Sequence, residues 1–254
     1  TPRLLQLAKV KGKGNLLNYA EYKKLLVQQE DLLVSGAGPQ AEPMSLRIQE
    51  LYPILENMDE QIWREYQEAA DVAVLGGGAY RSLPPLMELC EEPMSMVQMA
   101  FEPQIYEHKE ILIIPSGALQ GYDASKFFKA RLDEFVKRGG VLICFTQPYG
   151  YNFSALPPMA PHPGPLPQGG EGGGSANGLG GLGYQQDQQC YYKGAYLDQV
   201  HPTLKNQQDG QIDVYSDGYF TQWPAQAITP IRRAKNDAPC VVIYPYGKGW
   251  VCAT

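Results

Sequence analysis

Two unbroken apolar runs, beginning at Ile111 and Val141, lie on either side of an amphipathic stretch, and this arrangement constrains the fold more than any other feature. A run without polar alternation is typical of a strand covered on both faces. Residues 124–138 between them have the spacing of a helix, which Gly139 and Gly140 would end. We expect its apolar side to bury Phe127, Phe128, Leu132, Phe135 and Val136. Buried strands joined through a helix predict a parallel sheet with right-handed crossovers.

The same pattern extends to both sides of this unit. Residues 72–75 form a short apolar run ended by glycines, residues 82–91 are helix-like, and residues 94–100 are a further strand candidate. Residues 211–220 and 238–254 have the pattern of strands or hairpin arms, with turn signals at Asp217-Gly218 and at residues 247–249. We therefore expect one α/β domain over residues 71–254.

Residues 1–70 are rich in helix formers and differ in pattern from the rest of the chain. Residues 18–34 and 45–69 both show apolar side chains at helical spacing, and Pro53 is expected to kink the second helix. Two amphipathic helices need a partner surface, which is either each other or the domain that follows.

Residues 157–183 interrupt the domain with a stretch in which glycine and proline dominate and Glu171 is the only charged residue. Such a segment buries too little apolar surface to offset its ordering entropy, so we predict a disordered insertion. Part of it, from Pro161 to Glu171, is similar to a translated interspersed repeat of bacterial reading frames.

Composition excludes several classes of function. A net charge of −6 argues against a nucleic-acid binder, and no apolar run is long enough to span a membrane. The five cysteines and three histidines show no spacing typical of disulfide frameworks or metal sites. We expect no metal and no cofactor. The chain begins with Thr1 and ends within a strand-like run, so we interpret it as a segment of a longer protein whose compartment stays undecided.

Four segments in a fixed order resemble the class I glutamine amidotransferase-like superfamily. They are ILIIPSG at 111–117, FVKRGGVLIC at 135–144, HPTL at 201–204 and YPYGKGWVCAT at 244–254. The resemblance is to the non-amidotransferase branch, which includes the trimerisation domain of β-galactosidases and related domains of large bacterial proteins. It implies a flavodoxin-like three-layer α/β sandwich over residues 71–254.

The catalytic branch of that superfamily uses a cysteine on a tight turn between strand and helix, flanked by small residues. Cys144 is the weak candidate here, but Leu142 and Thr146 occupy the flanking positions and the thiol falls inside the apolar run. A buried thiol has a raised pKa and is inert. The superfamily's triad histidine is followed two residues later by glutamate, whereas His201 is followed by Pro202 and Thr203. The triad is therefore not recognisable.

A ligand pocket, if one is present, should lie at the carboxyl ends of the parallel strands. The residues expected there are Gly76, Gly77, Ser116, Gly117, Ala118, Thr146, Gln147 and His201. The glycines after residue 75 could present backbone N–H groups to an anion, or could simply form a tight turn. Aromatic clusters such as Tyr219-Phe220 could stack on sugar rings or pack in the core.

Three hypotheses for function follow. The leading one is a non-catalytic module that binds a small ligand, such as a carbohydrate, or a neighbouring domain of the same longer chain. The second is a cysteine- or serine-dependent hydrolase acting on an amide or glycosidic substrate. The third is an assembly domain that forms homo-oligomers through its N-terminal helices.

Overall fold

The computed structural model describes residues 2–78, 94–97, 108–119, 126–147, 156, 182–186, 193–198, 211–215 and 218–254. The predicted helix at 82–91, residues 157–181 of the predicted insertion, and His201 lie outside these ranges. The chain divides into two compact units. One contains residues 2–73 and 94–96, and the other contains residues 74–78 and the described residues from 97 onwards.

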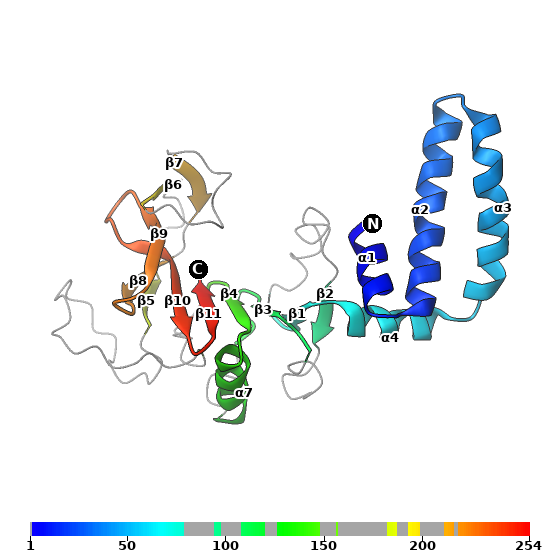
Figure 1. Cartoon of the computed structure of the whole chain (residues 1–254). Helices are drawn as coiled ribbons and strands as arrows, with labels where there is room; N and C mark the ends of the chain where they lie inside the picture. The colour runs from blue at the N-terminus through cyan, green and yellow to red at the C-terminus, as the bar shows by residue number, and fades with distance from the viewer. Residues whose placement is uncertain are drawn as a thin grey trace. The chain divides into compact units, whose positions relative to one another are not determined.

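The N-terminal unit contains four helices (Figure 1): α1 Pro2–Val10, α2 Gly14–Val34, α3 Gly38–Leu55 and α4 Asp59–Ala69. The two long helices α2 and α3 form an antiparallel hairpin. The prediction of one kinked helix over residues 45–69 is wrong, because α3 ends at Leu55 and α4 begins at Asp59. Asn57 between them has φ 67°, a left-handed conformation that asparagine tolerates well. Pro53 lies inside α3, so the chain breaks after the proline and not at it.

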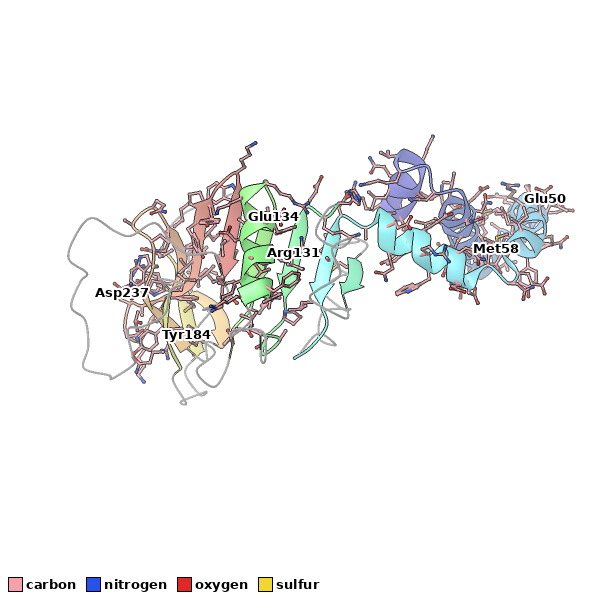
Figure 2. The ribbon with its side chains drawn as sticks, turned by 90° about the horizontal axis from the view of Figure 1, so that it is seen from below. Glu50, Met58, Arg131, Glu134, Tyr184 and Asp237 are labelled. Atoms are coloured by element: carbon pink, nitrogen blue, oxygen red, sulfur yellow. The ribbon has the colours of Figure 1, made fainter. Side chains whose placement is uncertain are left out.

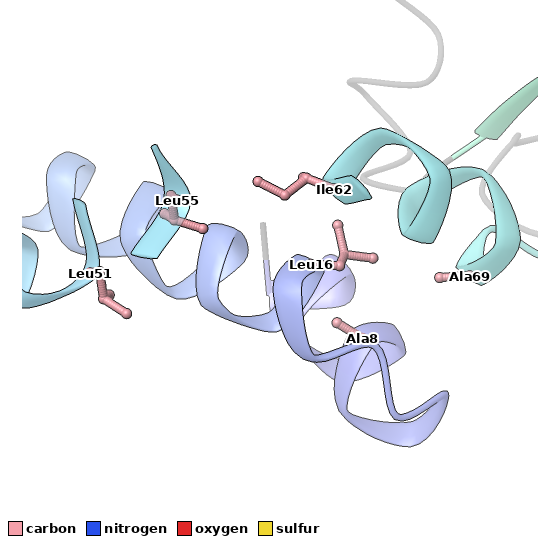
Figure 3. Packing of buried hydrophobic residues seen from close by; sticks show 6 residues of the cluster. All are labelled: Ala8, Leu16, Leu51, Leu55, Ile62 and Ala69. Carbon is pink, nitrogen blue, oxygen red and sulfur yellow. The ribbon is translucent and has the colours of Figure 1, made fainter. Parts of the chain in front are cut away.

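All four helices contribute to one apolar core (Figure 3). Its buried members are Ala8, Leu16, Leu51, Leu55, Ile62 and Ala69. Glu65 of α4 adds a polar link, since its carboxylate accepts hydrogen bonds from the Leu16 backbone N–H at 2.8 Å and from the Asn15 side chain at 2.9 Å. The first turn of α2 has no capping side chain of its own. Glu65 therefore satisfies an N-terminal donor of α2 that would otherwise lack a partner.

The C-terminal part of the chain is an α/β structure, as predicted. A nine-stranded sheet has the order β2-β1-β3-β4-β11-β10-β9-β6-β7, and β5 and β8 form a separate pair. The bounds are β1 Val72–Leu75, β2 Met94–Val97, β3 Ile111–Ile114, β4 Val141–Cys144, β5 Gly183–Gln186, β6 Lys193–Leu197, β7 Gln211–Tyr215, β8 Gly218–Gln222, β9 Ile228–Arg233, β10 Pro239–Tyr246 and β11 Gly249–Ala253.

The sheet is mixed, whereas the sequence predicts a mostly parallel one. Strands β3, β4 and β11 pair in parallel, but β11, β10, β9, β6 and β7 pair antiparallel in that order. The reversal occurs at the two-residue turn Gly247-Lys248, where Tyr246 pairs with Gly249. So short a connection can join only antiparallel strands.

Residues 211–215 and 218–222 form strands, as predicted for residues 211–220, but β7 and β8 belong to different sheets and do not pair as a hairpin. The predicted insertion also extends too far, because Leu182 is buried and Gly183 begins β5. Strand β5 pairs with β8, and Tyr184 packs edge-on against Phe220 across this pair. The burial of Leu182 and the strand pairing of residues 183–186 are features that composition alone does not predict.

Helix α7, Lys126–Lys137, covers one face of the sheet. Tyr246, on the same side of β10 as the buried Tyr244, donates a hydrogen bond to Asp133 of α7 and packs under Lys137. The strand registers place Val251 and Cys144 on this same face. Four of the five predicted apolar residues of α7 are buried here: Phe128, Leu132, Phe135 and Val136.

Phe127 departs from that prediction. It is half-exposed on the outer side of α7, and its ring lies 5.1 Å from the Arg131 guanidinium. Figure 2 shows Arg131 and Glu134 on this helix, where they form an ion pair of 3.6 Å. The outer side of α7 is thus largely charged, and the first aromatic residue of the helix lies at its edge.

Candidate functional site at the carboxyl ends of β1, β3 and β4

The loops that follow β1, β3 and β4 meet at one edge of the sheet. Gly77 lies next to Ala118, because a Cβ added at Gly77 would be 3.7 Å from Ala118 Cα. Gly78 lies closer still, since a Cβ there would be 2.6 Å from the Ala118 nitrogen and would clash with the Ser116 carbonyl. Only glycine fits at position 78, where φ is 51°. The structure therefore brings the predicted residues of these loops together.

The hydroxyl groups at this edge bind the loops to one another. Ser116 Oγ donates to the Thr146 carbonyl at 2.6 Å, and the Gly117 N–H donates to the same carbonyl at 3.2 Å. Thr146 Oγ1 in turn donates to the Thr254 carbonyl at 2.9 Å. Both side chains, which the sequence predicts as ligand contacts, thus have protein partners that link β3, β4 and the end of β11.

Gln147 is the most buried polar residue of the edge, with 1% of its surface exposed. Its amide oxygen accepts from the Leu119 N–H at 3.0 Å, and its amide nitrogen donates to the Pro115 carbonyl at 2.9 Å. The same nitrogen contacts the Phe145 carbonyl at 2.5 Å. One side chain therefore fixes both the loop after β3 and the strand end that precedes it.

Cys144 lies within β4, with no exposed surface. Burial raises the pKa of its thiol, and the neighbouring Cys252 raises it further, although a contact of 3.7 Å between Sγ and Gln147 Nε2 acts in the opposite direction. A thiol attacks as thiolate, so a buried sulfur with a raised pKa is a poor nucleophile. Leu142, on the same side of the strand, is equally buried, as the alternation of the run predicts.

The described edge offers backbone groups and little reactive side-chain chemistry. Gly76, Gly77, Ser116 and Gly117 are partly exposed, whereas Ala118 is buried. Within the described ranges no cluster of His, Cys, Asp and Glu could hold a metal ion, and no described helix is long and apolar enough to cross a membrane. His201 lies outside the described residues, so its relation to the edge is undefined.

Two contributors to this edge escape sequence reasoning. The Thr254 carbonyl accepts the Thr146 hydroxyl, and the Leu119 N–H meets Gln147. The first follows from the parallel register of β4 and β11, in which Cys144 pairs with Ala253. No local motif specifies that β11 pairs with β4. The run at 250–253, which is apolar like the other central strands, is the one sequence signal that suggests a central position for this segment.

Neither a family model nor a curated protein matches this chain. Among solved structures, an exo-β-1,4-mannosidase, Op5Man5, from Opitutaceae bacterium strain TAV5 gives a TM-score of 0.43 at 15% identity, over 79% of this chain and 34% of that one. The GH42 β-galactosidase Gan42B from G. stearothermophilus gives 0.43 at 15% identity, over 83% and 30%. A catalytic mutant of Gan42B gives 0.40 at 17% identity, over 82% and 30%.

This chain therefore spans about a third of the length of the solved structures it matches. Similarity at this level does not assign it to a family.

Proposed function

We propose that residues 71–254 form a non-catalytic module of the amidotransferase-like type, with a flavodoxin-like layered arrangement, inside a larger bacterial protein. The observation that carries this proposal is the complete burial of the Cys144 thiol. Cys144, the candidate nucleophile that the resemblance points to, has no exposed surface and a raised pKa.

The strand-end edge supports a binding role better than a chemical one. Its polar side chains are occupied by contacts among the loops, so the surface left to a partner is the partly exposed backbone of residues 76–78 and 116–117. A backbone-lined surface suits another domain of the same longer chain. A small carbohydrate ligand is the alternative that the same edge could accept.

Thiol labelling tests the non-catalytic proposal. The native chain is treated with iodoacetamide between about pH 6 and pH 9, and each cysteine is followed by peptide mass spectrometry. We expect Cys144 to stay unmodified, while the half-buried Cys240 serves as an internal reference. Selective modification of Cys144 below about pH 7 would instead favour the hydrolase.

Hydrogen exchange tests the binding edge. The amides of residues 76–78 and 116–119 are followed with and without added oligosaccharides of galactose or mannose. Protection confined to these amides identifies a carbohydrate ligand. Unchanged exchange with all sugars leaves the neighbouring domain as the partner, and binding of sugar without protection of these amides excludes this edge.

Assembly is a second candidate function, favoured by the surface of the N-terminal unit. Eight of its large apolar side chains are exposed: Val10, Val27, Leu33, Val34, Leu46, Tyr52, Ile54 and Trp63. Exposed apolar side chains mark an interaction surface where they lie together, and Val27, Leu33 and Val34 lie within two turns of α2. We propose that this unit associates with another protein surface. Sedimentation of the full chain over a wide concentration range tests whether that surface belongs to a second copy.

A further inference from the structure

One side of α2 carries charges in an order that is mirrored about Val27. Residues 23–31 read Lys-Lys-Leu-Leu-Val-Gln-Gln-Glu-Asp, so bases precede Val27 and acids follow it at equal separations. Positions three, four and seven residues from Val27 share its side of an α-helix. We call this side the Val27 face; its members are Lys23, Lys24, Val27, Glu30, Asp31 and Val34. All are exposed, Val27 by 59% and Val34 by 84%.

Helix α3 occupies the opposite side of α2. Gln29 donates to Ser45 of α3, and Arg47 of α3 forms an ion pair of 2.9 Å with Glu21. Around the helix, Gln29 lies about 160° and Glu21 about 120° from Val27. The hairpin contact therefore leaves the Val27 face uncovered.

The Val27 face continues a side of α2 that is packed in the first turns of the helix. Leu16 lies eleven residues before Val27, close to three full turns, and is fully buried in the core with Ala8 of α1 and Ile62 of α4. Ala20, seven residues before Val27, is also fully buried. Figure 1 shows α2 extending well beyond α1 and α4. The side that they cover near Leu16 is thus exposed from Lys23 onwards.

None of Lys23, Lys24, Glu30 and Asp31 forms an ion pair with another described residue. Lys24 has a longer-range attraction to Glu21, which is itself paired with Arg47 of α3. Bases and acids on this face are about two turns apart, beyond the reach of pairs three or four residues apart. Asp31 lies in the last turn of α2, where an acidic side chain interacts unfavourably with the helix dipole.

We infer that the Val27 face binds the same face of a second copy, with the two α2 helices antiparallel and Val27 at the two-fold axis. Antiparallel pairing places Lys23 opposite Asp31 of the partner subunit and Lys24 opposite Glu30 of the partner subunit. The two-fold axis repeats both pairs, so every charge of the face gains an opposite one. Val27 contacts Val27 of the partner subunit at the centre.

The contact is one helix wide and its ion pairs are exposed, so the dimer is weak and sensitive to salt. This inference deepens the assembly proposal by naming the partner and the face. The inference can be refuted without refuting the assembly proposal, since a dimer formed through another surface would contradict only the inference.

Cross-linking at the axis tests the geometry directly. The full chain with Val27→Cys is oxidised under mild conditions and compared with wild type and with Leu46→Cys, an equally exposed position on α3. We expect covalent dimer from Val27→Cys at several times the yield of either control, because only at a two-fold axis do equivalent thiols meet. Equal yields from the two variants would overturn the inference.

Charge reversal tests the pairing. Sedimentation velocity at about 0.05 M salt is expected to show a wild-type dimer that dissociates at about 0.5 M salt. Lys23→Glu/Lys24→Glu and Glu30→Lys/Asp31→Lys should each weaken self-association at least about tenfold, and an equimolar mixture of the two should associate. The fourfold exchange of all these charges should restore the homodimer, and circular dichroism confirms that each variant is folded.

Three outcomes would contradict the charge pairing. Dimers that persist unchanged in both double variants would place the interface elsewhere and refute this inference alone. A folded fourfold variant that stays monomeric would also refute it. A wild-type chain that is monomeric up to about 1 mM at low salt would refute self-association, and the assembly proposal would then require a different partner.

Discussion

The Gln147 side chain accepts a hydrogen bond from the backbone N–H of Leu119 at 3.0 Å, and so a buried amide on one strand end supports the loop that follows the neighbouring strand. The same amide donates to the Pro115 carbonyl. The sequence predicts this side chain as a ligand contact, but both its amide oxygen and its amide nitrogen form hydrogen bonds with the protein backbone. Its removal is expected to affect stability before it affects binding.

Gln147→Leu should lower the free energy of unfolding by about 2–3 kcal/mol, because the buried Leu119 N–H and Pro115 carbonyl lose their partner. Urea denaturation followed by fluorescence measures the change. Gln226→Leu, at an exposed turn, is the matched control and should change stability by less than about 0.5 kcal/mol. Equal effects at the two positions would show that the Gln147 contacts do not stabilise the edge.

Gly247→Ala should destabilise the α/β unit by about 2 kcal/mol or more. The residue has φ 60°, and a Cβ there would approach Lys137 Cα to 2.6 Å, so both the backbone conformation and the packing against α7 oppose it. Gly36→Ala is a control for conformation alone, because φ is 78° and no atom lies within 4 Å of the added Cβ. That change should cost about 1 kcal/mol in thermal unfolding of the helical unit. A cost at Gly247 no larger than at Gly36 would exclude the clash.

Stability of the α/β unit should fall as pH rises above about 9. Burial raises the pKa of Cys252 from 9.0 to about 11, and it raises the pKa of Cys144 as well. Unfolding releases protons from both thiols in this range, so each contributes a loss of up to about 1.4 kcal/mol per pH unit until its folded pKa is reached. The stabilisation is fully present below the ordinary thiol pKa.

Urea midpoints at pH 7, 9 and 10 measure this loss. Cys252→Ala should make the pH profile shallower even if it lowers stability at pH 7, since one of the two titrating groups is gone. Cys240→Ala on β10 is the comparison for the loss of a cysteine side chain in the same unit. A profile that is equally steep in the wild type and in Cys252→Ala would contradict the assignment.

Glu65→Ala should destabilise the helical unit by about 1 kcal/mol, because the Leu16 N–H in the first turn of α2 loses its acceptor. Helical circular dichroism during thermal unfolding records the effect. Glu60→Ala on the same helix provides the comparison, since its carboxylate is highly exposed and forms only a loose pair of 3.9 Å with Arg64. The prediction fails if Glu60→Ala is as costly as Glu65→Ala.

The central strands could be predicted because a continuous run of apolar residues indicates a buried strand without knowledge of its neighbours in the sheet. The runs at Ile111 and Val141 are apolar at every position, and each forms a strand with two or more buried residues. Strand β9 escaped prediction since Pro230, Arg232 and Arg233 interrupt its pattern. Arg233 is nevertheless buried, with its guanidinium 5.1 Å from the ring of Tyr219 on β8. Only tertiary contact makes such a segment a strand.

At the edge of the sheet, too, some features follow from the local sequence and others follow only from tertiary contacts. Glycines after β1 and the Ser116-Gly117 pair are strand-end signals that depend on neighbours in sequence, and the structure brings them together. The hydrogen bonds of Thr146 and Gln147 depend on the register between strands that lie far apart in the chain. Pattern reasoning therefore finds the position of the edge but not the use of its polar groups.

The place of β11 in the sheet affects the order in which the chain can fold. This strand pairs in parallel with β4 and antiparallel with β10, yet residues 145–248 separate it from β4. During synthesis the β2-β1-β3-β4 part and the β10-β9-β6-β7 part of the sheet stay unjoined until residues 249–253 emerge from the ribosome. Closing so long a loop is slow. Chaperones that shield open strand edges would therefore meet this chain late in translation, with β4 as the edge to be protected.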